Sequence, residues 1–288
     1  MCNEIHFRIR ETIANYTLFD DLFMSEVFNN NVELTQYVLR VILQKDDLVV
    51  TSVISQHSMI NIMGKGARLD IEAFDSEGNY YDVEVQRARK PGIRERARFY
   101  QAMMDAEQVS KGDDFKEIRK SYIIFILDYD LYGDNYPIYH VESQIRENGD
   151  PYDDGRRIIY VNGTYRNMNE EIGKLMHDFS CSDYREIKSD LIRETLRPYK
   201  ETDSKEYAKM SELFERIFGD EIDKFNAQIE EEKQRNREKD LMLEKKDAML
   251  EEKDLVIEKN AREVERLRKL LKEHGIDCSV SDAQISDN

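Results

Sequence analysis

Residues 67–87 constrain the fold of this chain more than any other segment, because their side chains alternate in character along two short runs. In the first run Leu69, Ile71 and Ala73 alternate with Asp70, Glu72 and Phe74. In the second, YYDVEVQ (80–86), Tyr80, Asp82, Glu84 and Gln86 alternate with Tyr81, Val83 and Val85. Ser76–Asn79 between them is rich in turn residues. The pattern predicts a β-hairpin with one apolar face and one face that carries acids.

Outside the hairpin, the spacing of apolar residues predicts both helices and strands. Residues 122–127, YIIFIL, form a continuous apolar run, which is typical of a strand buried on both faces of a sheet. The other expected elements are two helices within 16–44 separated by Asn29–Asn31, strands at 47–54, 137–142 and 157–162, and helices at 93–110 and over most of 168–218. We therefore expect an α/β domain with a mixed central sheet flanked by helices.

The chain changes character near residue 220, where apolar residues begin to recur at a seven-residue spacing. The segments KDLMLEK, KDAMLEE and KDLVIEK repeat nearly verbatim over 239–259. This predicts a long charged helix over 221–274, a candidate coiled coil through which the chain would form homo-oligomers. The second apolar stripe is poor, so a solvated single helix is an equal alternative. We expect a domain over 1–220, the helix over 221–274 and a disordered tail over 275–288.

Composition limits the class of protein. The net charge of −17 argues against a protein that coats nucleic acid, although a local basic surface is enough for an enzyme that acts on it. The three cysteines are far apart and form no CxxC pair. No run of 18 apolar residues occurs, and the N-terminus has no apolar core of signal-peptide type. These features predict a cytoplasmic protein without a membrane span, a disulfide framework or a zinc site.

The acidic face of the predicted hairpin carries a candidate metal site. Asp70 and Glu84 stand on neighbouring strands, nearly opposite each other under any short turn. Mg²⁺ prefers oxygen ligands and takes one or two carboxylates together with waters and substrate phosphate. Hydrolysis of a phosphodiester needs such a cation to neutralise the developing charge and to activate water. The pair therefore indicates metal-dependent phosphodiester hydrolysis, whereas the pattern alone is more often a solvated face.

Polar and basic residues follow Glu84 closely. Gln86 faces the same side as Glu84, where it could orient water or contact a phosphate oxygen. A basic cluster comes next, made of Arg87, Arg89, Lys90, Arg94, Arg96 and Arg98. It suits contacts to a phosphate backbone, although pairing with the abundant acids is the favoured explanation of the cluster alone. Glu72 and Asp82 share the acidic face, either as bystanders or as further ligands.

The stretch GKGARLDIEAFDSEGNYYDVEVQR (64–87) resembles the signature of the PD-(D/E)XK nuclease family transposases, also called the recombination-promoting nuclease (Rpn) family. The similarity continues before it in FDDLFMSEVF and after it in RERARFYQAMMD and KSYIIFILDYDLYGDNYPIYHVE. It covers roughly residues 16–200, in the right order. The chain departs from the broader superfamily pattern at Leu69, which replaces a proline, and at Gln86, which replaces a lysine.

The resemblance implies a restriction-endonuclease-like core and Mg²⁺-dependent cleavage of DNA, with Mn²⁺ able to replace Mg²⁺. By position, Asp70 is the motif aspartate, Glu84 the second acid and Gln86 the residue at the usual lysine position. An acid on the first helix often completes such sites, and Asp21 is preferred here over Glu26. Arg96 and Tyr100 match family positions on the following helix. With the basic cluster, the predicted substrate contacts are Arg87, Arg94, Arg96, Arg98 and Tyr100.

Two hypotheses for the function stay open. The first is an active endonuclease of the transposase or recombination-promoting type. The second is a non-catalytic binding or assembly protein that keeps the nuclease fold and oligomerises through its C-terminal helix. The sequence does not distinguish DNA from RNA, or single strands from double strands.

Overall fold

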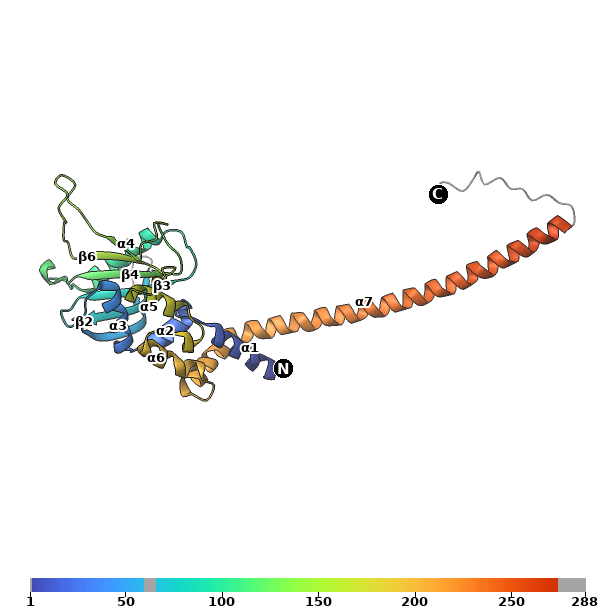
Figure 1. The fold of residues 1–288 in the computed structure, drawn as a ribbon, viewed down its shortest axis with the longest axis horizontal. Helices are drawn as coiled ribbons and strands as arrows, with labels where there is room; N and C mark the ends of the chain where they lie inside the picture. Colours follow the sequence, from blue (N-terminus) through green and yellow to red (C-terminus); the bar gives the residue numbers. More distant parts are fainter. Residues whose placement is uncertain (1, 60–65, 274–288) are drawn as a thin grey trace. The chain divides into compact units, whose positions relative to one another are not determined.

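The computed structural model describes residues 2–59 and 66–273, and the centre of its fold is a six-stranded sheet (Figure 1). The strands lie in the order β1-β2-β3-β4-β6-β5, with β3, β4 and β6 parallel and the other neighbours antiparallel. They are β1 (Val50–Met59), β2 (Ala67–Asp75), β3 (Tyr80–Gln86), β4 (Ser121–Leu127), β5 (Ile138–Val141) and β6 (Arg156–Asn162). The predicted fold class, a mixed sheet flanked by helices with a long C-terminal helix, is confirmed.

Strands β2 and β3 form the predicted hairpin, and its turn is held by its own side chains. The Asp75 carboxylate accepts hydrogen bonds from the backbone N–H groups of Glu77 (2.9 Å) and Asn79 (2.8 Å). Gly78 takes the positive φ of 79° that a turn of this kind needs. Cross-strand pairs from Ile71–Val83 to Phe74–Tyr80 set the register. Asp75, the last residue of β2, therefore holds the turn together with its side chain.

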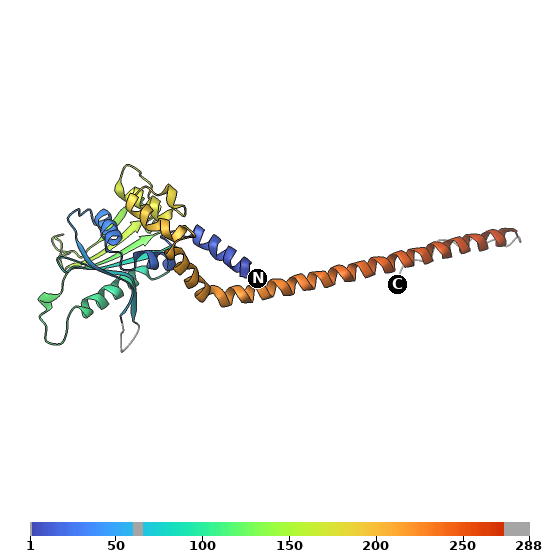
Figure 2. The same ribbon diagram turned by 90° about the horizontal axis from the view of Figure 1, so that it is seen from below.

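The parallel strands β3 and β4 are joined by helix α4 (Ile93–Glu107), as a parallel connection requires. All residues of β4 are buried, which agrees with the apolar run in its sequence. The buried face of α4, which includes Ala97 and Met104, packs with Phe125 in one core cluster. Helices α2 (Asp21–Phe28) and α3 (Val32–Leu43) contact β1. Figure 2 shows α4 (green) and α3 (blue) on opposite sides of the sheet.

One helix and two element boundaries differ from the prediction. Helix α1 (Cys2–Asn15) was not predicted; it buries Ile9 and Ile13, which stand one turn apart. Strand β1 continues to Met59, because residues 55–59 pair with β2 although none of them is β-branched. Helix α7 (Lys205–Glu273) begins well before residue 221.

The chain divides into two compact units, Met1–Ile217 and Phe218–Asn288. In the first unit, α5 (Glu171–Ser180), α6 (Asp190–Lys200) and the first turns of α7 complete the core, with Met210 and Phe214 almost fully buried. In the second unit, the described part is the rest of α7. No helix in residues 2–59 or 66–273 combines the length and apolar character needed to cross a membrane. The predicted tail lies outside the described residues.

Candidate active site

Asp70 and Glu84 meet where the β2–β3 ladder ends. The last backbone pair of that ladder is Ile71–Val83, so the next backbone groups are free to bind side chains. The Asp70 backbone N–H donates to Glu84 Oε1 (3.1 Å), and the Val85 N–H donates to Asp70 Oδ2 (3.3 Å). Each carboxylate is thus anchored to the opposite strand through one oxygen. Its second oxygen, Asp70 Oδ1 or Glu84 Oε2, accepts no backbone hydrogen bond among the described residues.

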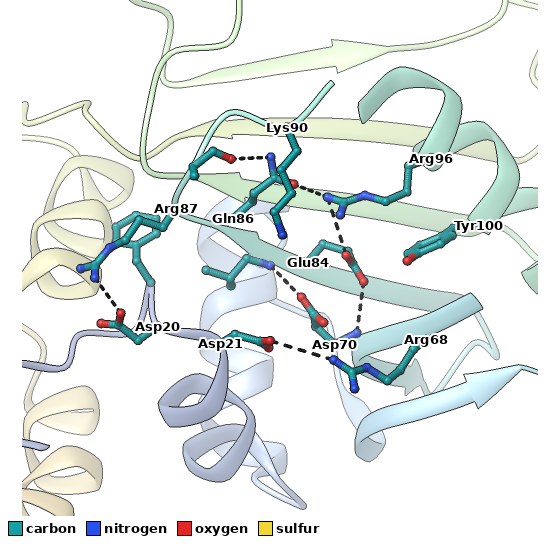
Figure 3. A pocket seen from close by; sticks show the side chains of 13 residues that line it. Asp20, Asp21, Arg68, Asp70, Glu84, Gln86, Arg87, Lys90, Arg96 and Tyr100 are labelled. Carbon is teal, nitrogen blue, oxygen red and sulfur yellow. Dashed lines mark hydrogen bonds and ion pairs between the residues drawn. The ribbon is translucent and has the colours of Figure 1, made fainter. Parts of the chain in front are cut away.

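The two acids line a cavity of about 400 Å³ at the end of the hairpin (Figure 3). Its lining residues come from α2 and the loop before it, from β2, from the end of β3 and the loop after it, and from α4. The lining residues are Phe19, Asp20, Asp21, Arg68, Asp70, Glu84, Val85, Gln86, Arg87, Ala88, Lys90, Arg96 and Tyr100. The cavity therefore joins segments from four parts of the sequence around one pair of carboxylates.

The environment of this pair disfavours two negative charges. Burial raises the pKa of Glu84 to about 8, and the charge of Asp70 adds to the effect while Arg96 opposes it. Burial also raises the pKa of Asp70 to about 6, with a further contribution from Asp21. Ionised together, the acids repel each other, and the nearby guanidinium compensates only in part. A divalent cation would relieve this repulsion.

The donor set fits a hard divalent cation that keeps part of its hydration shell. Asp70 and Glu84 offer two carboxylate oxygens, the number that Mg²⁺ usually takes from a protein. In the described residues no group of three or more His, Cys, Asp or Glu side chains is arranged to hold a metal. Asp21, the predicted third ligand, does line the cavity, but its carboxylate lies 4.0 Å from Arg68. Two carboxylates with water and substrate are therefore the arrangement these residues favour.

Gln86 is already fully engaged by the protein. Its amide nitrogen donates to the Ala88 carbonyl (2.8 Å) and to the Tyr129 hydroxyl (3.0 Å). Its oxygen accepts a short hydrogen bond from the Arg96 guanidinium. The same guanidinium nitrogen lies 3.9 Å from Glu84 Oε2. Gln86 therefore fixes Arg96 beside the acids, rather than presenting a free amide to water or phosphate as the sequence suggested.

The structure brings together only part of the predicted basic cluster. Three of its members line the cavity, Arg87, Lys90 and Arg96, and so does Tyr100, whereas Arg89, Arg94 and Arg98 do not. Arg94 lies over the ring of Tyr132 instead (5.4 Å). Arg87 pairs with an acid, as the alternative explanation required: its guanidinium donates to Asp20 (2.6 Å) and also lies 3.7 Å from Asp128.

The remaining acids of the hairpin and of α2 lie outside the cavity. Glu72 pairs closely with His57, and Glu26 pairs with Lys209 (2.7 Å). Asp82 is fully buried, and neither of its carboxylate oxygens has a hydrogen-bond partner within residues 2–59 and 66–273. Burial, with the charge of Glu84 next in size, raises the pKa of Asp82 well above its ordinary range. Among the acids considered from the sequence, only Asp21, Asp70 and Glu84 therefore face the cavity.

Comparison with known families covers the hairpin, the cavity and most of the chain. A family model of the PD-(D/E)XK nuclease family transposases matches residues 17–259. The chain belongs to this family. No curated protein and no solved structure gives a significant match. The predicted family is thus confirmed, and α1 lies outside the matched range.

Three charged residues of this cavity were not assigned to the site from the sequence. Arg68 stands two residues before Asp70, a spacing that places both on one face of a strand and could have identified it. Lys90 was recognised only as a member of the basic cluster. Asp20 gave no signal, because its partner Arg87 lies 67 positions further along the chain.

Proposed function

We propose that this member of the PD-(D/E)XK nuclease family transposases is a Mg²⁺-dependent endonuclease that hydrolyses phosphodiester bonds in DNA. The observation that supports this most is the convergence of Asp70 and Glu84 in a cavity that also contains Arg68, Lys90 and Arg96. Acids that repel each other are suited to a divalent cation, and the surrounding basic groups are suited to phosphate.

In this proposal Asp70 and Glu84 hold the cation through the oxygens that do not accept backbone hydrogen bonds. Bound Mg²⁺ would supply a water of lowered pKa and polarise the phosphoryl oxygens. Arg96, fixed by Gln86, offers N–H donors to a non-bridging phosphate oxygen. Burial raises the pKa of Tyr100 to about 12, so its phenol stays protonated at neutral pH and can donate to the same phosphate.

The direct test removes one charge from each acid without changing its shape. We expect Asp70→Asn and Glu84→Gln to abolish plasmid cleavage in Mg²⁺ and to lose Mn²⁺ binding in calorimetric titration. Glu77→Gln is the matched control, because it neutralises an acid in the turn of the same hairpin, outside the cavity. If Asp70→Asn cleaves DNA as well as the wild-type protein, the assignment of the site is wrong.

The choice of DNA rests on the family, whose members are described as nucleases and transposases. Digestion of DNA and RNA of identical sequence, each as single and double strands, tests this choice. We expect DNA to be cut and RNA to be spared. Cleavage of RNA alone would contradict the proposed substrate while leaving the metal site intact.

A second candidate function is self-assembly through α7, and the observation that favours it is a row of exposed apolar side chains. Leu243, Leu250, Ile257 and Val264 recur at seven-residue spacing, and each is about half exposed. A second copy of this helix is the proposed partner, because lysines and acids alternate around the row in residues 239–259 and copies would repel each other little. Sedimentation should show a dimer that Leu250→Glu dissociates, while a monomeric wild-type protein would contradict self-assembly.

A further inference from the structure

Among the described residues, Lys90 is a cation of the cavity that makes no hydrogen bond or ion pair within the protein. We propose that Lys90 contacts the phosphate at the bond to be cut and stabilises the charge that develops on it. This inference rests on the proposed nuclease function. It gives the task of a charged phosphate contact to a residue in the loop after β3, rather than to Gln86 within the strand.

Gln86 cannot perform this task, because it is neutral and every polar group of its carboxamide is engaged. Its amide nitrogen donates hydrogen bonds to the Ala88 carbonyl and the Tyr129 hydroxyl, and its amide oxygen accepts one from Arg96. Turning this amide toward a substrate would break these hydrogen bonds and release Arg96 from its support. The side chain is therefore a support for Arg96.

The other cations of the cavity have acidic partners. Arg87 pairs with Asp20, Arg68 lies 4.0 Å from Asp21, and Arg96 lies 3.9 Å from Glu84. Lys90 has no hydrogen bond or ion pair with any residue in the described parts of the chain, and it is exposed to solvent. A phosphate can bind this ammonium group without first displacing a carboxylate.

The loop around Lys90 is anchored on both sides of it. The preceding residue, Arg89, donates to the Asp130 carbonyl (2.6 Å) and lies over the ring of Tyr129 (4.6 Å). The following residues are Pro91, whose φ is fixed by its ring, and Gly92, the N-cap of α4 with φ 80°. Figure 3 shows the Lys90 side chain extending from this loop into the cavity, past Gln86 and toward Glu84. The backbone thus holds the lysine at the cavity, while its ammonium group binds no other described residue.

The chemistry of an ammonium group suits this position. It is a compact charge with three N–H donors on a flexible stem, so it can follow a phosphate as the geometry at phosphorus changes. Loss of one preorganised donor to a developing oxyanion typically costs about 100- to 1000-fold in rate. We expect Lys90→Ala to lower the cleavage rate by this factor, and Lys90→Arg to restore part of it.

The test uses the full chain with Lys90→Ala, Lys90→Arg and, as control, Lys111→Ala, which removes an exposed lysine outside the cavity. We expect Lys90→Ala to cut DNA at least about 100-fold more slowly while binding Mn²⁺ within twofold of the wild type. In Ca²⁺, DNA binds without being cut. There the slope of the logarithm of the binding constant against the logarithm of the salt concentration should be shallower for Lys90→Ala, by the amount expected for about one lost phosphate contact. Lys111→Ala should match the wild type in all three assays.

Two results would overturn the inference in distinguishable ways. If the wild type cleaves, Asp70→Asn does not, and Lys90→Ala cleaves within threefold of the wild type, the role of Lys90 is wrong and the nuclease proposal stands. If the wild type itself does not cleave, the proposed function fails. The DNA-binding assay in Ca²⁺ then shows whether Lys90 contacts a phosphate. An unchanged salt dependence of DNA binding in Lys90→Ala refutes that contact, and a reduced salt dependence supports it.

Discussion

Neutralising Glu84 should make the metal-free protein more stable at alkaline pH, although it removes a residue of the proposed active site. Burial and the charge of Asp70 raise the pKa of Glu84 from 4.5 to about 8. In the unfolded chain the group loses its proton near pH 4.5, whereas in the folded protein it keeps the proton until about pH 8. The folded state binds more protons between these values, so the free energy of unfolding falls as the pH rises through this window.

The size of the effect follows from the same values. At about 1.4 kcal/mol per pKa unit, the rise in the pKa of Glu84 corresponds to a loss of about 5 kcal/mol in the free energy of unfolding once Glu84 is ionised. Water in the open cavity and the Arg96 guanidinium respond to the charge, so we expect Glu84→Gln to recover about 2–5 kcal/mol at pH 9. For a domain of roughly 200 residues, each kcal/mol raises Tm by about 2–4 °C.

Thermal unfolding of the wild type and Glu84→Gln between pH 4.5 and 9, in the presence of a chelator, measures this difference. We expect the variant's advantage in Tm to be small at pH 4.5 and largest at pH 9. Glu77→Gln, from the exposed turn, should show no such trend. Saturating Mg²⁺ should stabilise the wild type more than Glu84→Gln at pH 9. A variant that melts at or below the wild-type temperature at pH 9 without metal would refute the electrostatic argument.

Three further predictions concern the surroundings of the site. Asp82→Asn should raise Tm at pH 8, measured by calorimetry, because it removes a buried carboxylate that has no hydrogen-bond partner among the described residues. An unchanged or lower Tm would contradict this. Gln86→Ala should lower the cleavage rate, because Arg96 loses the hydrogen bond that positions it. The double variant with Arg96→Ala should cleave as fast as Arg96→Ala alone, and additive losses in rate would argue against a shared role. A chain ending at residue 220 should unfold cooperatively in urea, whereas one ending at 204 should be destabilised by several kcal/mol, because it lacks the buried Met210 and Phe214. Equal free energies of unfolding for the two chains would refute this.

The sequence predicts the hairpin and the central strand correctly because their signals are local. Alternation along 69–74 and 80–86 and the apolar run at 122–127 depend only on neighbouring residues. Helix α1 and the end of β1 were missed for the opposite reason. Ile9 and Ile13 are a weak amphipathic signal, and residues 55–59 become a strand only because β2 lies beside them.

The candidate site shows the same division between local and distant information. The spacing of Asp70 and Glu84 across one turn was enough to predict that they meet. The state of Gln86 was not predictable, because its partners Tyr129 and Arg96 come from other elements of the fold. For the same reason, nothing local distinguished Lys90, which has no partner in the part of the chain that the structure describes, from Arg87, which pairs with Asp20. Residue type indicates which groups can act, whereas tertiary contacts decide which of them are available.

The central claim, that Asp70 and Glu84 share one divalent cation, is tested most directly by anomalous X-ray scattering from crystals grown with Mn²⁺. The account predicts a single strong peak in the cavity, within about 2.0–2.4 Å of one oxygen from each carboxylate, and no peak there in Asp70→Asn. A peak bound to other residues, or none at all at saturating Mn²⁺, would contradict it.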